Sequence, residues 1–201
     1  MLFRSVFIGR LSREKNVKLL LDSIKAVNKV QQITLDIIGD GGDIIIDKDL
    51  NSIVTHHGKL SHMEIRHILN YCDYLILPSY TEGIPFTVLE SMMYGIPCIY
   101  SNINGATDVI TNNHTGFLFT LKGYEKSKDI IDNFDHVFES VDNYFQENIL
   151  NLTTCILHAY SININEWNHM SYLCKQFIKD TFSKEVARDI FEKHIHKMID
   201  T

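Results

Sequence analysis

This 201-residue sequence lacks the features that mark several classes of protein. Positive charge is in deficit, because 19 Lys and Arg stand against 25 Asp and Glu and the net charge is −6. Nucleic acid is therefore not an expected partner, since phosphate backbones attract a basic face. No apolar run approaches the about 20 residues that cross a bilayer, and the N-terminus lacks the charged-then-apolar pattern of a secretory signal. We expect a globular protein of the cytoplasm.

Paired cysteines and metal-ligand spacings are missing as well. The cysteines lie far apart without a Cys-x-x-Cys pair, and we interpret them as reduced thiols of a cytosolic protein: Cys72, Cys98, Cys155 and Cys174. The closest histidine pairs are His56-His57 and His194-x-His196. Neither pair has helical metal-ligand spacing with a third ligand nearby, so no metal site is predicted.

The sequence does contain a regular alternation of strand-like and helix-like stretches up to about residue 120. Strands are expected at residues 6–8, 33–38, 53–54, 74–77, 96–100 and 116–119. Helices are expected at 16–29, from a capping box at 61–64, at 85–94 and at 105–111. This order predicts an α/β fold, a Rossmann-like doubly wound parallel sheet with helices on both faces. Ligands bind such sheets beyond the carboxyl ends of the strands.

Composition divides the chain into three parts. Residues 1–121 are expected to form the Rossmann-like domain, and its first strand begins almost at the N-terminus. That abrupt start suggests the second half of a larger protein. Residues 122–160 are polar, and we interpret them as a helical insertion. Residues 161–201 carry two apolar helical stripes and are expected to pack on the domain as a C-terminal helical extension.

Two cations follow the first expected strand. Gly9 permits a tight turn, and Arg10 and Lys15 then face the rim of the sheet, five residues apart. Such a pair can neutralise a diphosphate. The alternative is two solvated charges near the start of a helix, where the helix dipole mildly disfavours cations.

Two glutamates, Glu82 and Glu90, lie on either side of the start of the helix expected at 85–94. Glu82 precedes free backbone N–H groups, and a helix N-terminus attracts anions and hydroxyls. Glu90 lies one to two turns inside the helix and can face the same rim, where its carboxylate can accept two hydrogen bonds from a ribose diol. The alternative is one cap residue and one surface residue.

Taken together, these stretches resemble a known family. The stretches "FIGRLSREKNVKLLLDSI", "LDIIGDGG" and "HHGKLSHMEIRHILNYCDYLILPSYTEGIPFTVLESMMYGIPCIYSNINGATDVITNNHTGFLF" occur in a familiar order and spacing. It is that of the nucleotide-sugar-binding domain of retaining GT-B glycosyltransferases of group 1. The resemblance covers about residues 3–120 and returns in "FSKEVARDIFEKHI", which is similar to the family's terminal helix. The E-x7-E motif, the upstream Gly-Arg…Lys and the Leu-Pro-Ser lead-in are, as a set, highly specific.

The resemblance implies a role for each matching residue. Arg10 and Lys15 match the basic pair that holds the donor's diphosphate in place of a metal ion. Glu82 matches the glutamate that contacts the donor sugar near the reacting centre, and Glu90 matches the one that grips the ribose hydroxyls. Arg10, Lys15 and Glu82 are thus the implied catalytic residues. The remaining implied donor-binding residues are Gly9, Lys59 and Leu60 near the base, and the turn of Gly83, Ile84, Pro85 and Phe86.

The resemblance also implies an activity. The chain would be the donor half of a retaining, metal-independent hexosyltransferase, with a UDP- or GDP-sugar as substrate and no cofactor. A glycan or lipid-linked acceptor would be bound by a first domain that this sequence lacks, so the chain alone should bind donor without efficient transfer. Peripheral association with a membrane is left open.

Departures from the family and rival interpretations remain. Asn104-Gly105-Ala-Thr-Asp108 stands where many members have Gly-Gly-x-x-Glu, and about 25 residues between 122 and 150 look inserted. Asp47-Lys-Asp49 resembles the metal motif of another class of sugar transferases, but it lies in a polar segment where a solvated loop is expected. One rival is a non-catalytic nucleotide-sugar-binding module or a remnant of a split gene. Another is a flavodoxin-like regulatory domain that binds no nucleotide.

Overall fold

The computed structural model describes residues 3–42, 46–82, 85–124 and 134–183. Its centre is a six-stranded sheet in the order β3-β2-β1-β4-β5-β6, and every neighbouring pair is parallel. The strands are β1 (Phe3–Ile8), β2 (Ile33–Ile38), β3 (Val54–Gly58), β4 (Tyr74–Leu77), β5 (Cys98–Ser101) and β6 (Gly116–Phe119). The strand order reverses between β1 and β4. In doubly wound sheets this switch point is where the loops part and a ligand can enter.

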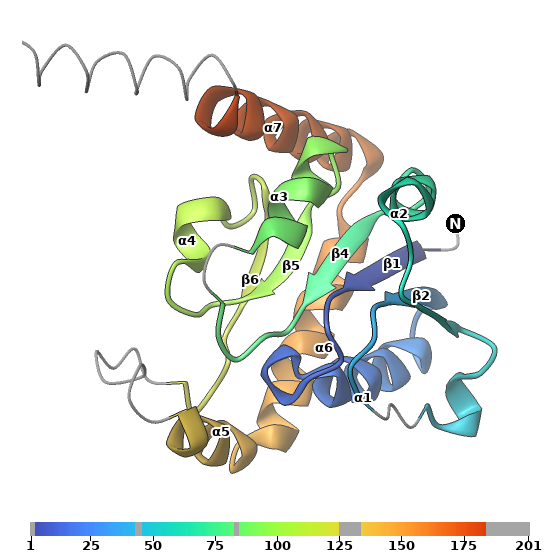
Figure 1. Ribbon diagram of the computed structural model, residues 1–201, viewed down its shortest axis with the longest axis vertical. Coiled ribbons are helices and arrows are strands. Elements are labelled where there is room, and N and C mark those ends of the chain that lie inside the picture. The colour runs from blue at the N-terminus through green and yellow to red at the C-terminus, as the bar shows by residue number, and fades with distance from the viewer. Residues whose placement is uncertain (1–2, 43–45, 83–84, 125–133, 184–201) are drawn as a thin grey trace, which may run out of the picture.

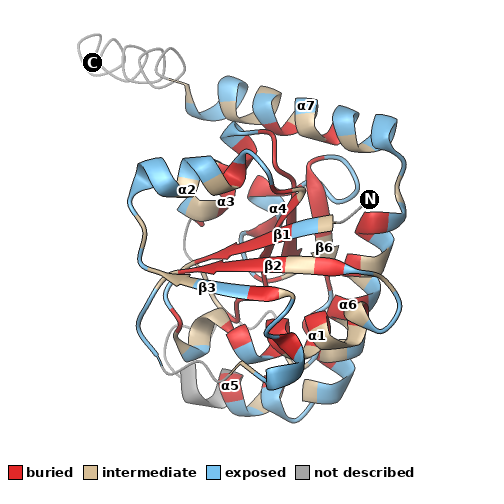
Figure 2. Ribbon diagram, turned by 90° about the vertical axis from the view of Figure 1, so that its right-hand side faces the viewer, coloured by how far each residue is buried: buried red, intermediate tan, exposed pale blue. Residues whose placement is uncertain are grey.

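Helices cover both faces of the sheet (Figure 1 and Figure 2). One face carries α1 (Val17–Asn28) and α6 (Phe145–Ser161), and α5 (Phe134–Asp142) lies beyond the carboxyl-terminal end of the strands. The other carries α2 (His62–Leu69), α3 (Phe86–Met93), α4 (Ala106–Val109) and α7 (Ile164–Phe182). Two short 3₁₀ turns, η1 (Arg13–Lys15) and η2 (Lys48–Leu50), lie in the loops after β1 and β2. The predicted doubly wound α/β fold with C-terminal helices is therefore confirmed.

Burial of the sheet on both faces follows from the sequence of its strands. All four residues of β4 and all four of β5 are buried. Figure 2 shows most of the neighbouring β1 and β2 in the red of buried residues. A parallel strand covered on both sides needs a near-continuous apolar run rather than alternation, and "YLIL" meets that need. The strands predicted at 33–38, 74–77 and 116–119 are confirmed to the residue.

Some predicted element bounds were wrong. The helix expected at 16–29 is Val17–Asn28, because Asn16 takes a left-handed conformation with φ 52° that a helix interior does not allow. The helix expected at 105–111 is a single turn, Ala106–Val109. The capping box is confirmed, since the Ser61 amide donates to Glu64 Oε2 at 2.8 Å.

Part of the segment expected as an insertion is built into the core. Helix α6 packs against α1, and the hydroxyls of its Tyr160 and of Ser5 in β1 are 2.5 Å apart. The Tyr74 hydroxyl of β4 donates to the Ala159 carbonyl at 2.8 Å. The sheet and α6 therefore share one core, whereas the division of the chain at 121 and 160 stays a prediction. The final helical pattern, from Ser183 onward, lies almost entirely outside the described residues.

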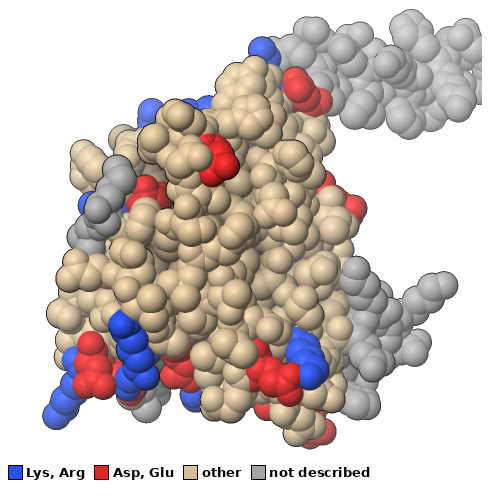
Figure 3. All heavy atoms as spheres, turned by 180° about the vertical axis from the view of Figure 1, so that it is seen from behind, with Lys and Arg blue, Asp and Glu red and all other residues tan. Residues whose placement is uncertain are grey.

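Charges of both signs lie side by side along the lower edge of the face that Figure 3 shows. Ion pairs on the surface include Lys18 with Asp22 at 2.6 Å, and Lys25 with Asp47 at 2.9 Å. Such a mixture differs from the one-signed basic face that nucleic acids attract. Within the described ranges, no helix is both long and apolar enough to cross a bilayer.

The cysteines are all free, and three of the four are buried. Burial raises the pKa of the Cys72, Cys155 and Cys174 thiols to about 12. At pH 8 about one such thiol in ten thousand is then ionised, and the thiolate is the reactive form. We expect Ellman's reagent to label the native chain slowly and all four thiols quickly in concentrated guanidinium chloride. A thiol that reacts as fast in the native chain as in denaturant would contradict this burial.

Candidate functional site

Lys15 and Glu82 form an ion pair at the carboxyl-terminal edge of the sheet. Lys15 is the last residue of η1, in the loop after β1, and Glu82 lies in the loop after β4. The pair thus spans the switch point of the strand order. The Lys15 side chain is 19% exposed and that of Glu82 is 10% exposed. Because little water screens the two charges, their attraction exceeds that of an ordinary surface pair.

Hydrogen bonds hold the two loops to each other. The Tyr80 amide donates to the Glu14 carbonyl at 2.8 Å, and the Ser79 hydroxyl donates to Glu82 Oε1 at 2.7 Å. An ammonium group has three N–H donors, and Lys15 gives one to Glu82. No other hydrogen bond of the Lys15 side chain is present within the described part of the chain. Two of its donors are therefore available to a ligand.

A pocket of about 340 Å³ opens beside this ion pair. Its lining residues are Arg10, Ser12, Glu14, Lys15, Thr81, Glu82 and Phe138. The structure thus brings together all three residues that the sequence marked as catalytic, Arg10, Lys15 and Glu82. The size is within the range of small-molecule sites. Two cations suit an anionic ligand, and the neighbouring carboxylates suit its hydroxyl groups.

The glycine loops after β1, β2 and β3 support the position of Arg10. The Gly9 amide donates to the Ile38 carbonyl at 3.0 Å, and the Leu11 amide donates to the Asp40 carbonyl at 2.8 Å. The residues on both sides of Arg10 are therefore tied to β2 and its loop. The Arg10 side chain is exposed and makes no ion pair with the residues that the structure describes.

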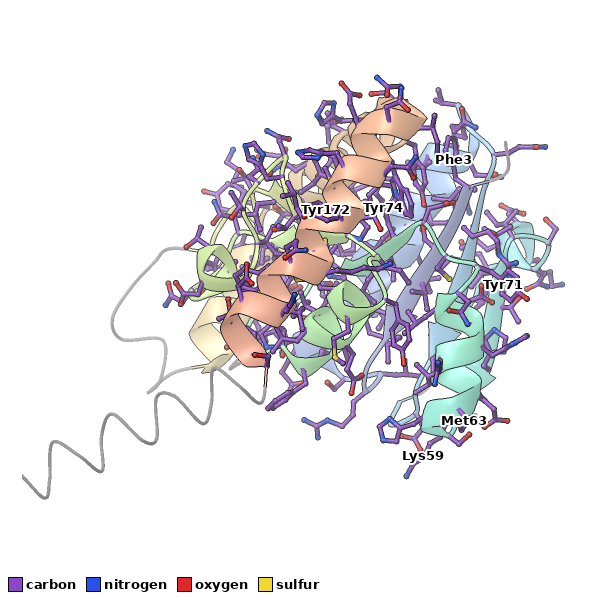
Figure 4. The ribbon with its side chains drawn as sticks, turned by 90° about the horizontal axis from the view of Figure 1, so that it is seen from above. Phe3, Lys59, Met63, Tyr71, Tyr74 and Tyr172 are labelled. Atoms are coloured by element: carbon purple, nitrogen blue, oxygen red, sulfur yellow. The ribbon has the colours of Figure 1, made fainter. Side chains whose placement is uncertain are left out.

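The other residues implied to bind the donor do not line the 340 Å³ pocket. Glu90 is half-buried in α3, and its side chain makes no hydrogen bond or ion pair with any described residue. Pro85 is buried as the N-cap of α3, and the next residue, Phe86, is 71% exposed. Lys59 and the half-buried Leu60 follow β3, and Figure 4 shows Lys59 near one end of α2. Gly83 and Ile84 lie outside the described residues.

Several residues of the pocket region were not among the predicted site residues, and Ser79 and Phe138 are two of them. Ser79 follows β4 directly and lies three residues before Glu82, so its place at a strand end offered a clue to its hydrogen bond. Phe138 comes from α5, inside the segment interpreted as an insertion. Nothing in the pattern of that segment indicated a residue of the site.

The described residues contain no group of three or more His, Cys, Asp or Glu side chains that could hold a metal ion. Asp47 and Asp49 are exposed, and both pair with Lys25, at 2.9 and 3.1 Å. This is the arrangement expected of a solvated loop. His57 Nε2 lies 2.7 Å from Asp36 Oδ1, while the pair of His194 and His196 lies outside the described residues.

Solved structures of glycosyltransferases share this fold. A glycosyltransferase from Rickettsia africae aligns with 100% of this chain and 49% of its own, with a TM-score of 0.72 and 16% sequence identity. The pneumococcal O-GlcNAc transferase GtfA, solved with UDP and GlcNAc, aligns with 99% of this chain and 36% of its own, with a TM-score of 0.69 and 19% identity. The fold is that of one half of a GT-B glycosyltransferase.

The sequence assigns the family. Residues 3–141 match the glycosyl transferases of group 1, and the chain belongs to this family. A curated relative, an uncharacterised 41.2 kDa protein of the cps region of Klebsiella pneumoniae, is 25% identical over 179 residues, which are 89% of this chain and 42% of the relative. An Escherichia coli UDP-Gal:alpha-D-GlcNAc-diphosphoundecaprenol alpha-1,3-galactosyltransferase is 32% identical over 128 residues, 59% of this chain and 33% of the relative. The chain spans less than half the length of these relatives.

Proposed function

We propose that this chain carries the donor site of a retaining, metal-independent hexosyltransferase. The substrate is a nucleoside diphosphate sugar such as a UDP- or GDP-sugar, and no further cofactor takes part. The acceptor, a glycan or a lipid-linked sugar, is bound by a domain outside this sequence. The enzyme acts in the cytoplasm, in keeping with four free cysteines.

One observation carries the proposal: Arg10, Lys15 and Glu82 meet in one pocket at the switch point of the sheet. The two cations come from the loop after β1 and the carboxylate from the loop after β4. A rival flavodoxin-like regulatory domain gives no reason for a largely buried ion pair at this place. Burying such an ion pair costs desolvation energy. Binding of a charged ligand by Lys15 and Glu82 would explain why the fold bears this cost.

The chemistry follows from the charges. In the transfer, the bond between the anomeric carbon and the diphosphate oxygen breaks, and its electron pair leaves with the nucleoside diphosphate. The acceptor hydroxyl oxygen bonds to the same face of the anomeric carbon, and its proton passes to the departing diphosphate oxygen. Arg10 and Lys15 stabilise the negative charge that develops on the leaving diphosphate, the role a metal ion plays elsewhere. Glu82 receives hydrogen bonds from the sugar hydroxyls.

The relatives agree with this type of donor. The Escherichia coli relative is a transferase of galactose from UDP-Gal, and GtfA was solved with UDP and GlcNAc. The names of further relatives place them in the assembly of teichuronic acid and O-antigen. We therefore propose a role in the biosynthesis of a surface polysaccharide. Peripheral contact with a membrane fits a lipid-linked acceptor and belongs to the same proposal.

Binding of nucleotide to this chain tests the proposal. We expect UDP or GDP to bind the wild-type chain in isothermal titration calorimetry, and Glu90→Ala to weaken that binding at least tenfold, roughly the loss of one charge-assisted hydrogen bond. The reason is that Glu90 lies half-buried and unpartnered among the described residues, free to accept hydrogen bonds from a ribose.

Glu147→Ala is the matched control. Glu147 is an exposed helical glutamate of α6, paired with Lys122 and outside the 340 Å³ pocket, so its loss should leave the affinity unchanged. A wild-type chain that binds neither nucleotide at millimolar concentration would refute the donor site. Equal nucleotide affinities of the wild type and Glu90→Ala would show that Glu90 is not part of the donor site.

A further inference from the structure

Helix α5 reaches the proposed donor site from far along the sequence. It lies beyond the end of the sheet toward which β4 and β5 point (Figure 1). Its Phe138 is buried and lines the same pocket as Lys15 and Glu82. The helix belongs to the segment interpreted from the sequence as an insertion, and it supplies this wall of the pocket.

Two aromatic and cationic contacts hold Phe138 in place. The centres of its ring and the Tyr80 ring are 5.2 Å apart, with the planes inclined by 57°. The guanidinium carbon of Arg13 lies 4.7 Å from the centre of the Phe138 ring, a cation–π contact. Tyr80 lies two residues before Glu82, and Arg13 lies two residues before Lys15. The ring is therefore fixed by the same two loops that carry the ion pair.

Asp142, at the end of α5, joins these two loops. Its Oδ1 accepts a hydrogen bond from the Tyr80 hydroxyl at 2.8 Å, and its Oδ2 accepts one from Arg13 Nη2 at 2.8 Å. Burial and the neighbouring carboxylate raise the pKa of Tyr80 well above its ordinary value, so the hydroxyl keeps the proton that it donates. Each oxygen of the Asp142 carboxylate thus binds a residue from one of the two loops at the switch point.

A second pocket borders this contact. It has a volume of about 570 Å³, and Arg13, Tyr80 and Asp142 are among its lining residues. Side chains that border this open pocket are not packed against other atoms on that side, so they can shift at low cost. Without the hydrogen bonds of Asp142, α5 has room to move and to withdraw Phe138 from the pocket wall.

We propose that Phe138 determines which sugar the donor site accepts, and that Asp142 is the positioning residue that keeps Phe138 at the wall. This inference rests on the proposed function. Phe138 lines the pocket together with Glu82, which is proposed to contact the sugar of the donor. An apolar ring excludes a hydroxyl that would lose its hydrogen bonds against it, and it leaves the nucleotide part untouched. The axial or equatorial position of a sugar hydroxyl is therefore the property that it selects.

A panel of nucleotide sugars tests the inference. Affinities for UDP, UDP-glucose, UDP-galactose and UDP-GlcNAc, and for their GDP counterparts, are measured by calorimetry on wild type, Phe138→Ala and Phe138→Trp. We expect UDP affinity to change less than about twofold, and the ratio between the best and the worst sugar to change roughly tenfold in both variants. A purely structural role would weaken all ligands in parallel. Because Phe138→Ala opens a cavity, Phe138→Trp keeps the test usable if the smaller residue impairs folding.

Asp142→Ala tests the positioning part, and Glu147→Gln is its control. Both remove one partner of a comparably exposed ion pair, since Arg13–Asp142 is 54%/46% exposed and Lys122–Glu147 is 48%/54% exposed. The lost charge of Asp142 acts equally on UDP-glucose, UDP-galactose and UDP-GlcNAc, which carry the same charge, and it cancels in the ratio between these sugars. Asp142→Ala should change the sugar ratio as the Phe138 variants do, and Glu147→Gln should not.

The possible results distinguish the roles of Phe138 and Asp142 from the proposed donor site itself. Wild-type binding with unchanged sugar ratios in the Phe138 variants overturns this inference and leaves the proposed function standing. A changed ratio in the Phe138 variants but not in Asp142→Ala overturns the positioning role. A wild-type chain that binds no nucleotide overturns the proposed function and this inference with it.

Discussion

Gly39→Ala is expected to lower the free energy of unfolding by about 4 kcal/mol or more. Gly39 follows β2 with φ 139°, a conformation that residues with a side chain rarely adopt. A Cβ at this position would lie 1.9 Å from the Gly9 carbonyl oxygen, and both are backbone positions without a flexible end to move aside. The Gly39 amide also donates to the Gly58 carbonyl at 2.8 Å. The substitution therefore separates the loops after β1, β2 and β3.

Gly58→Ala distinguishes this crowding from backbone strain alone. Gly58 also has a positive φ of 67°, but a Cβ there would meet no atom within 4 Å. Gly58→Ala should lower the free energy of unfolding by about 1 kcal/mol, which is the ordinary penalty of a left-handed conformation for a residue with a side chain. Urea denaturation of both variants, followed by circular dichroism, gives the comparison. Equal costs at the two positions would show that the approach of Gly39 to Gly9 is not what holds the loops together.

The fold could be predicted from the sequence because the central strands are mostly apolar. The stretches 33–38 and 74–77 are bounded by glycine, proline or polar residues, and their lengths left little choice of register. Helix ends were harder to place, since they depend on contacts beyond the local pattern. Asn16 illustrates this, because its left-handed φ ends η1 before α1 begins. The presence of an asparagine in the sequence does not by itself predict that conformation.

The candidate site could be predicted in part, for a topological reason. Residues that follow parallel strands must gather at one edge, so Arg10, Lys15 and Glu82 could be placed together without coordinates. The ion pair between Lys15 and Glu82 could not, because side-chain pairing depends on how far each loop reaches. The position of Phe138 at this site could not be predicted from the sequence. It enters from α5, whose position is fixed by Asp142 and its two distant partners.

Lys15→Met is expected to weaken the binding of UDP or GDP about 100-fold, or roughly 2.7 kcal/mol. Methionine keeps the length and the apolar stem of lysine but removes the ammonium group. The two N–H donors that Lys15 has left beside Glu82 are then lost to the diphosphate. Calorimetry on the purified chain measures the effect. Lys18→Met is the matched control, because Lys18 lies in α1 with a side chain 74% exposed and pairs with Asp22 on the surface. The affinity of Lys18→Met for UDP or GDP should stay within about threefold of the wild-type affinity.

Stability separates a ligand-binding role of this ion pair from a structural one. In Lys15→Met the Glu82 carboxylate, 10% exposed, keeps the Ser79 hydroxyl but loses its counter-charge, which should cost roughly 1–3 kcal/mol of unfolding free energy. The double variant Lys15→Met with Glu82→Gln removes the unpaired charge and should recover most of that stability. It should not recover nucleotide binding, since both groups proposed to meet the donor are gone. If the double variant bound nucleotide as the wild type does, the pair would serve the fold alone, and the donor site would have to lie elsewhere on the rim.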